Sequence, residues 1–516
     1  MIIYSFSHTN LAQVLSNEYT SEAIVKKKNH FLYLKEYLGE NGLNAKQIVV
    51  EEDYISRDFL HDYTSYYALC FENYNKFCKR VHLFSSEFTK REIKDALIGV
   101  NESKSNEIWN SYLGFIVVKP IPVTVIGFSI LKTYSNGVDF GLRNFWGTRE
   151  YKVHFYGKEL TVQSLAFQEQ DSVVSACATT AIWAMLNKAA LDHYTILKSP
   201  TEITNDADEL SSDGSRLFPN NGLNILQISK AIFKSGMVSE IKQADAQFKN
   251  KNGEAICNVV SKQYLKKIIN AYSSIGIPII LIINVPNGNN YGLHAVTVSG
   301  YKKKAPVHIA PTKEVNYLSD NIQKIYAHDD QWGPFVRISF NEDHSLNIPW
   351  SEFHPQKSPT VATNIVVPLY PKIRIAFEDI EVITLGLDAI LTFFFDKALQ
   401  ADLVWDIKLH FSEDFKQSVK SSNLETSLKE QLLMNSLPKY LWVVSCYVAE
   451  IKIFDFTFDA TDVKNGMIGK DVVCYISDKY KKDLSSFLSI NSKILSGLFR
   501  HPASEVYYNF LIDKLK

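Results

Sequence analysis

Segments rich in β-branched residues, and segments with apolar residues at helical spacing, alternate along the first part of this chain. Residues 112–118 and 123–131 belong to the first kind and are separated by a Pro-Ile-Pro sequence, which predicts two strands joined by a rigid turn. Residues 58–79 carry aromatic side chains at helical spacing, and we interpret this stripe as core packing. The first region is therefore predicted to be a mixed α/β domain.

The middle of the chain combines helical patterns with apolar strands. Residues 277–283 form a continuous apolar run that predicts a buried strand, paired with a second strand at 292–301 across a polar loop. Helices are predicted at 178–190, 223–234 and 261–275. A helical lobe is thus expected to face a sheet lobe, with a cleft between them.

The last part of the chain again mixes both patterns. It predicts strands at 440–449 and 451–458 and helices near 384–400, 424–435 and 502–514. We place domain boundaries to give regions 1–155, 156–370 and 371–516, with a linker at Pro368-Leu369-Tyr370-Pro371. The first and third regions show no set of residues that carries chemistry, so their roles stay open.

Composition indicates a globular protein with several cores. The 516 residues are 46% hydrophobic, and 55 basic residues against 56 acidic residues give a net charge of −1. No basic stripe predicts binding to nucleic acid, and the most apolar stretches, near 113–131 and 382–395, are interrupted by charges or prolines, so no membrane span is expected. Six cysteines without CxxC spacing argue against zinc and disulfides and favour a reducing compartment. With no signal peptide visible at the start, we expect a cytoplasmic protein.

One cysteine stands at the start of a predicted helix. Cys177 follows a polar segment, and Asp171, Ser172 or Ser175 can cap the helix that begins there. The unpaired N–H groups and the positive dipole end of the first turn would stabilise a thiolate. Taken alone, this segment fits a buried structural cysteine about as well as a nucleophile.

A histidine and an acid later in the chain favour the nucleophile. His294 begins the β-branched run of the strand at 292–301, and Asp329 follows the next short strand. Neighbouring Asp330 competes with Asp329, but strand alternation predicts that the two point to opposite faces and that one alone reaches His294. We expect His328 to be an exposed residue at the strand end.

The order Cys177, His294, Asp329 and the placement of these residues on helix and strands resemble the papain-like cysteine peptidase superfamily. The nearest branch is the bacteriocin-leader-processing peptidase domains of exporters and their stand-alone relatives, and the similarity covers roughly residues 156 to 370. The resemblance implies an α+β fold with a helical lobe and an antiparallel sheet lobe. It also implies a bacterial thiol hydrolase that cleaves a peptide or isopeptide bond through an acyl-enzyme, without metal or cofactor.

The resemblance also implies an oxyanion hole formed by the Cys177 N–H and a glutamine side chain. The family places this glutamine six residues before the cysteine, where this chain has Asp171. A local bulge would have to align Gln170, which we prefer, or Gln168. A second departure is an insertion at 302–323, which could form a lid or part of a substrate groove.

Two other functions stay open. The displaced glutamine also fits a catalytically silent papain-like fold that serves as a binding module, and the same triad serves acyltransferases and deamidase-type effectors. The expected partners are a peptide or protein substrate and, through the flanking regions, a regulatory protein.

Overall fold

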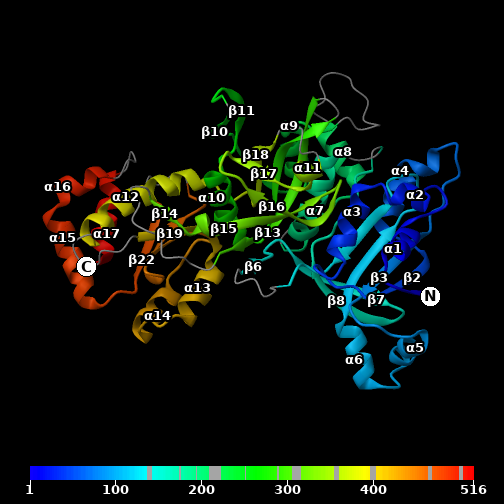
Figure 1. The fold of residues 1–516 in the computed structure, drawn as a ribbon. Helices are drawn as coiled ribbons and strands as arrows, with labels where there is room; N and C mark the ends of the chain where they lie inside the picture. Colours follow the sequence, from blue (N-terminus) through cyan, green and yellow to red (C-terminus); the bar gives the residue numbers. More distant parts are fainter. Residues whose placement is uncertain are drawn as a thin grey trace.

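The computed structural model describes most of the chain in three consecutive regions that follow one another along an elongated molecule (Figure 1). The described residues are 1–135, 142–171, 173, 176–192, 195–208, 222–249, 252–287, 290–304, 315–353, 359–395, 403–462, 468–498 and 504–515. Helices and strands are mixed in every region, so the fold class is α+β.

The N-terminal region is built on a five-stranded antiparallel sheet. Its strands lie in chain order: β1 (Ile2–Ser5), β2 (Gln47–Tyr54), β3 (Cys78–Phe84), β4 (Tyr112–Val118) and β5 (Ile126–Leu131). The two strands predicted around the Pro-Ile-Pro turn are confirmed as β4 and β5. The accompanying helices are α1 (His8–Leu15), α2 (Glu22–Val25), α3 (Asn29–Tyr37), α4 (Arg57–Ser65), α5 (Lys90–Ile98) and α6 (Glu102–Asn110).

The aromatic stripe at 58–79 is core packing in part: Tyr74 of its second half also packs against the core. Phe59 on α4 and Tyr67 on the 3₁₀ turn η1 (Tyr67–Leu69) are buried, whereas Phe71 is fully exposed. The predicted periodicity fails because α4 ends at Ser65, so the later aromatic residues no longer share a helical face.

The central region contains a sheet that closes on itself. Strand β12 pairs with both β13 and β18, and all these pairings are antiparallel. The cycle runs through β12 (Ile279–Asn287), β13 (Asn290–Lys303), β15 (Ile322–Asp329), β16 (Gly333–Phe340), β17 (Ser345–Asn347) and β18 (Thr360–Leu369), with β9 (Val238–Lys242) and β6 (Arg143–Asn144) at its edges. The predicted pairing of the apolar strand with the His294 strand is confirmed, with Ile283 opposite His294.

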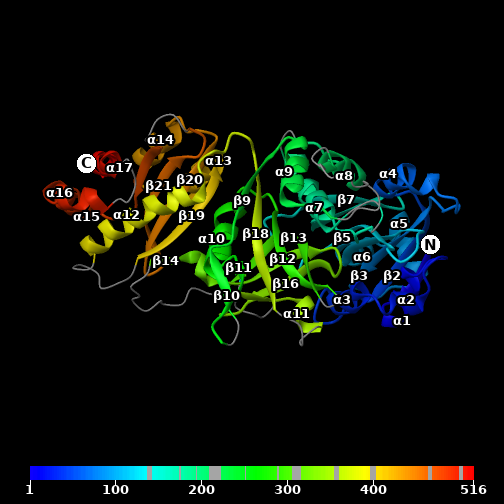
Figure 2. The same ribbon diagram turned by 90° about the horizontal axis from the view of Figure 1, so that it is seen from above.

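Helix α7 (Cys177–Asp192) packs against this closed sheet (Figure 2). Its apolar residues are almost fully buried, among them Ile182, Trp183 and Leu186, and the Thr297 hydroxyl of β13 donates a hydrogen bond to Ala181 O over 3.0 Å. The other helices of the region are α8 (Pro200–Asp208), α9 (Ile225–Lys234), α10 (Lys262–Ser273) and α11 (Pro349–Phe353). The predicted helices at 223–234 and 261–275 are confirmed as α9 and α10.

Two hairpins complete the first two regions. They are β7–β8 (Arg149–Phe155 and Lys158–Ser164) and β10–β11 (Ala246–Lys249 and Ala255–Val259). The turn of the β7–β8 hairpin lies on the boundary drawn at residue 155, while β6, earlier in the chain, already pairs with β13. The first two regions are therefore interwoven in this part of the chain.

The C-terminal region has a sheet of its own with helices beside it (Figure 1). The sheet runs β14 (Asn316–Tyr317), β19 (Leu403–Phe411), β20 (Tyr440–Val448), β21 (Ile451–Asp459) and β22 (Gly469–Cys474), and the helices are α12 (Phe377–Phe395), α13 (Ser412–Ser421), α14 (Thr426–Met434), α15 (Asp478–Ile490), α16 (Ser492–Leu495) and α17 (Ser504–Leu515). The strands and helices predicted here are confirmed where they fall within the described residues.

The insertion between β13 and β15 joins the central and C-terminal regions. Its strand β14 pairs in parallel with β19, and the following 3₁₀ turn η2 (Leu318–Asn321) packs on α10 and β19. The described end of the insertion thus extends the C-terminal sheet. Among the described helices of the chain, none is long and apolar enough to cross a lipid bilayer.

Candidate active site

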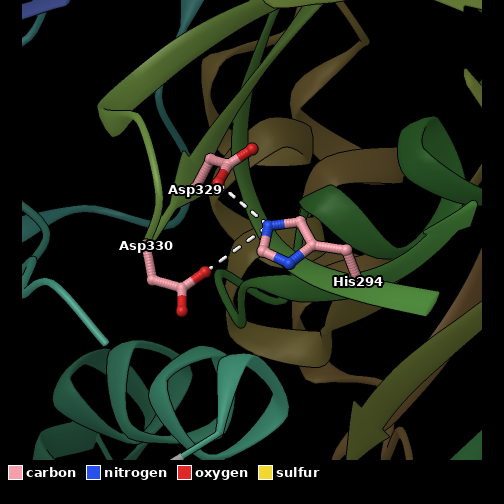
Figure 3. Close-up of side chains that lie close together, drawn as sticks. All are labelled: His294, Asp329 and Asp330. Carbon is pink, nitrogen blue, oxygen red and sulfur yellow. Dashed lines mark hydrogen bonds and ion pairs between the residues drawn. The ribbon is translucent and has the colours of Figure 1, made fainter. Parts of the chain in front are cut away.

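His294 lies on β13, the strand against which α7 packs. Its side chain is 2% exposed, and its ring Nε2 is 2.9 Å from Asp329 Oδ1 (Figure 3). Asp329 is the last residue of β15, which pairs with β13, so neighbouring strands of the sheet hold the pair together. The structure therefore brings together the histidine and the acid that the sequence singled out.

Asp329 is held by two further donors. The indole Nε1–H of Trp350, on α11, donates to Oδ2 over 2.8 Å, and the backbone N–H of Gln331 donates to Oδ1 over 3.0 Å. The Trp350 ring also packs edge-on against the His294 ring at 5.4 Å between centroids. Trp350 thus restrains both members of the pair, and buried indole groups of this kind need a hydrogen-bond acceptor. No pattern in the sequence marks this tryptophan as a residue of the site.

The electrostatics of the pair favour its ionised form. Burial alone would lower the pKa of His294, but the charge of Asp329, its hydrogen bond and the contact with Cys177 hold this pKa well above its usual range. Burial alone would raise the pKa of Asp329, but the His294 charge and the three hydrogen bonds hold it below its usual range. Each group therefore stabilises the charged form of the other, imidazolium and carboxylate.

Cys177 is the first residue of α7 and is partly exposed. Its side chain lies close enough to the His294 ring to raise the pKa of that histidine. Because Nε2 of the ring faces the carboxylates, Nδ1 is the nitrogen left for the thiol, and Figure 3 shows it turned away from both acids. The histidine therefore lies between a cysteine and an acid.

The segment before Cys177 is anchored by the N-terminal region. Asp171 accepts hydrogen bonds from the Tyr67 hydroxyl over 2.7 Å and from the Val173 N–H over 3.1 Å, and it lies 3.8 Å from Lys119 Nζ in a buried ion pair. The other two predicted capping residues, Ser172 and Ser175, lie outside the described residues.

Asp330 also reaches His294, contrary to the prediction that the two acids point to opposite faces. Its Oδ1 is 3.4 Å from His294 Nε2 (Figure 3). The alternation rule fails because β15 ends at Asp329, with a register shift in its pairing just before, so Asp330 belongs to a turn. Neither of its carboxylate oxygens accepts a hydrogen bond from the described residues, and burial raises its pKa to about 7.

The two candidate glutamines line different cavities, each of which Asp330 also lines. Gln170 lines an open cavity together with Asp330 and Gln331, and its backbone N–H donates to Asp330 O over 3.4 Å. Gln168 is 5% exposed and lines a small cavity against Thr180 of α7. Gln170 is thus the more accessible of the two.

His328 differs from the sequence prediction of an exposed strand end. It is 4% exposed, its Nε2–H donates to Leu165 O over 3.0 Å, and its Nδ1 accepts the Phe335 N–H over 3.1 Å. Burial lowers its pKa to about 4, so the ring is neutral. The prediction of an exposed His328 is therefore wrong, because the rings of Phe167 and Phe335 cover its side chain.

The atoms of His294, Asp329 and Asp330 lie close enough together to hold a metal ion. An ion there would take His294 Nε2 away from Asp329, so metal binding and the hydrogen-bonded pair exclude each other.

Comparison with known proteins returns no match. No protein-family model matches the sequence, no curated protein is similar to it, and no solved structure resembles its fold at a significant level. The activity is therefore argued from the site itself.

Proposed function

We propose that the chain is a papain-like thiol hydrolase that cleaves a peptide or isopeptide bond. The observation that carries the proposal is the position of His294, whose Nε2 is hydrogen-bonded to Asp329 and whose pKa is also raised by nearby Cys177. The placement of Cys177 at the start of a buried helix, packed on a closed antiparallel sheet that carries His294 and Asp329, supports the papain-like assignment.

Each residue has a defined part in the reaction. The Cys177 Sγ attacks the carbonyl carbon as thiolate, and the resulting tetrahedral oxyanion collapses to a thioester as His294 gives its proton to the departing nitrogen. His294 then takes a proton from water, which attacks the thioester and releases the carboxylic acid and the free thiol. Asp329 keeps Nε2 protonated and stabilises the imidazolium in both steps.

The oxyanion needs donors that are already in position. The backbone N–H of Cys177, at the N-terminus of α7, is one, and we assign the side chain of Gln170 as the other because it lines an open cavity beside Asp330, the neighbour of the catalytic acid. In related chemistry a donor of this kind stabilises the transition state by about 3–4 kcal/mol.

The proposed substrate is a peptide or protein, and the proposed compartment is the cytoplasm. All six cysteines are free thiols. Free thiols persist in a reducing compartment, where a catalytic thiolate also keeps its reactivity.

The test is the alkylation rate of each cysteine by iodoacetamide across a range of pH, measured by peptide mapping. We expect Cys177 to react below pH 7 at least about tenfold faster than partly exposed Cys70 and Cys474. His294→Ala should abolish this advantage, because it removes the imidazolium that stabilises the thiolate. Buried Cys78, whose pKa burial raises to about 12, is the internal negative control. Equal rates at Cys177 and the other partly exposed thiols would overturn the proposal and favour the silent binding module.

A further inference from the structure

A second cavity lies beside the turn that follows the catalytic acid and is lined by neither Asp329 nor Cys177. Its volume is about 450 Å³, within the range of small-molecule binding sites, and it is formed by α3 of the N-terminal region, by β15, β16 and β17, and by the start of α11. Trp332 forms part of its wall. Nothing in the proposed hydrolysis uses this space.

Three basic side chains converge on the cavity. Lys35 comes from α3, Lys324 from β15 and Arg337 from β16, and Lys324 and Arg337 reach it from neighbouring strands of the sheet. Among the described residues, none of the three forms an ion pair with a carboxylate, and Glu36 is the single acid in the lining. Three cations against one acid leave an excess of positive charge that attracts an anion.

The position of the arginine is fixed by an aromatic ring. The Arg337 guanidinium lies 4.1 Å from the centroid of the Tyr134 ring, and Tyr134 is itself held by the Tyr33 hydroxyl at 3.2 Å. A stacked guanidinium keeps its N–H groups directed sideways, where they can bind a phosphate through two parallel hydrogen bonds. The Arg337 guanidinium is thus preorganised to bind a phosphate, and the two lysines of the cavity can neutralise the second negative charge of that phosphate.

The rest of the lining suits an organic group. Leu32, Trp332 and Pro349 supply apolar surface, and Asn41 and Asn347 supply polar groups. A volume of about 450 Å³ is also more than one inorganic phosphate fills. We propose that this cavity binds a small organic phosphate monoester, held by Lys35, Lys324 and Arg337.

An occupied cavity would contact the support of the catalytic acid. Trp332, in the cavity wall, packs edge-on against Trp350 at 5.9 Å between ring centroids, and Trp350 donates the hydrogen bond to Asp329. We therefore expect the ligand to change the reactivity of Cys177. This expected effect on Cys177 rests on the proposed function, whereas the binding of the ligand does not.

The test is calorimetric titration of the full chain with AMP and glucose 6-phosphate as probes, and with adenosine, glucose and inorganic phosphate as comparisons. We expect at least one ester to bind with a dissociation constant below about 1 mM, and the parent compounds without phosphate not to bind. Arg337→Gln should weaken binding at least about tenfold, and Arg337→Lys less. Arg91→Gln, at an exposed arginine of α5, is the matched control and should have no effect.

Two results would overturn the site: no heat of binding from any ester at millimolar concentration, or equal binding to wild type and Arg337→Gln. Inorganic phosphate binding as tightly as the esters would overturn the assignment of an organic ligand. Binding that leaves the alkylation rate of Cys177 unchanged would overturn the coupling to Asp329. The calorimetric outcomes do not depend on whether the chain hydrolyses peptides, because calorimetry reports binding alone; only the alkylation outcome rests on the proposed function.

Discussion

The N-terminal region contacts the central region at the candidate active site, through α3 and the segment after it. His30 Nε2–H donates to Asp330 O over 2.8 Å, and the Tyr33 hydroxyl donates to Pro334 O over 2.6 Å. The approach is so close that a Cβ added to Gly333 would lie 2.2 Å from the Tyr33 ring. This region thus holds the 329–334 turn that carries both acids.

The C-terminal region contacts other parts of the central region. Asn270 of α10 donates to Asp406 over 2.7 Å, Lys267 of α10 pairs with Glu381 at 2.6 Å, and Lys242 of β9 pairs with Glu378. Figure 1 shows the two flanking regions on opposite sides of the central sheet. The comparison indicates that the N-terminal region is part of the support of the site, whereas the C-terminal region stabilises the scaffold.

The largest difference in stability is expected from breaking one ion pair at each contact of the central region, one with the N-terminal region and one with the C-terminal region. Glu169 pairs with Lys28, and both side chains are largely buried, with exposed fractions of 6% and 12%. Glu169→Gln leaves the lysine charge without its partner and should cost about 3–5 kcal/mol in the opening free energy of α3. Hydrogen exchange of the α3 amides measures it.

Glu381→Gln is the matched control on the C-terminal side. It removes the same charge from a pair whose side chains are 22% and 21% exposed, so its cost should be about 1 kcal/mol or less. Cys177 alkylation should slow in Glu169→Gln and stay unchanged in Glu381→Gln. Equal slowing in both variants would mean that the two regions do not differ in their link to the site.

A smaller loss of stability is expected from changing two matched tryptophans, one near each contact, to phenylalanine. Trp350 Nε1–H donates to Asp329, and Trp405 Nε1–H on β19 donates to Asp388 over 2.7 Å. Changing either residue to Phe removes a hydrogen bond to a charged acceptor, worth about 1.5–3 kcal/mol of stability. Trp350→Phe alone should shift the pH profile of Cys177 alkylation, because the ionisation of His294 depends on Asp329. An unchanged profile in Trp350→Phe would contradict the role we give this indole.

How far the sequence predicts these contacts depends on whether a local pattern or a motif marks both partners. Periodicity was sufficient for β12, β13 and α7, because the pattern of buried positions within each segment reflects its own geometry. The pairing of His294 with Asp329, 35 residues apart on adjacent strands, was predicted from the order Cys177, His294, Asp329 and its resemblance to the papain-like triad. Trp350 and His30 could not be predicted, since no motif marks them and their partners, 21 and 300 residues away, belong to different elements. The position of Asp330 was wrong because alternation holds within a strand and not in the turn that follows.

The last difference is one of pH dependence, between the contact of the N-terminal region with the central region and the contact of the C-terminal region with it. On the N-terminal side, burial raises the pKa of Asp62, which accepts the Thr201 hydroxyl of α8, and that of Asp330, each to about 7. On the C-terminal side, burial alone would raise the pKa of Asp406, but Lys408 and Lys303 hold it below its usual range. The two contacts should therefore weaken at opposite ends of the pH range.

The sign follows from which state binds the proton more tightly. Asp62 and Asp330 hold protons in the folded state up to about pH 7, whereas the unfolded chain releases them near pH 4, so their stabilising contribution is lost as pH rises between these values. Asp406 contributes above the usual carboxyl pKa, and its contribution is lost as pH falls below it. Hydrogen exchange, corrected for the intrinsic rate, should show α3 and α4 loosening as pH rises from about 4 to about 7, and β19 loosening as pH falls below about 4. Asp62→Asn keeps the acceptor for Thr201 and should remove at most about 1.4 kcal/mol per pH unit from the slope on the N-terminal side, while leaving β19 unchanged. If α4 loosens equally with pH in Asp62→Asn and in wild type, the titration of this buried acid does not control the contact.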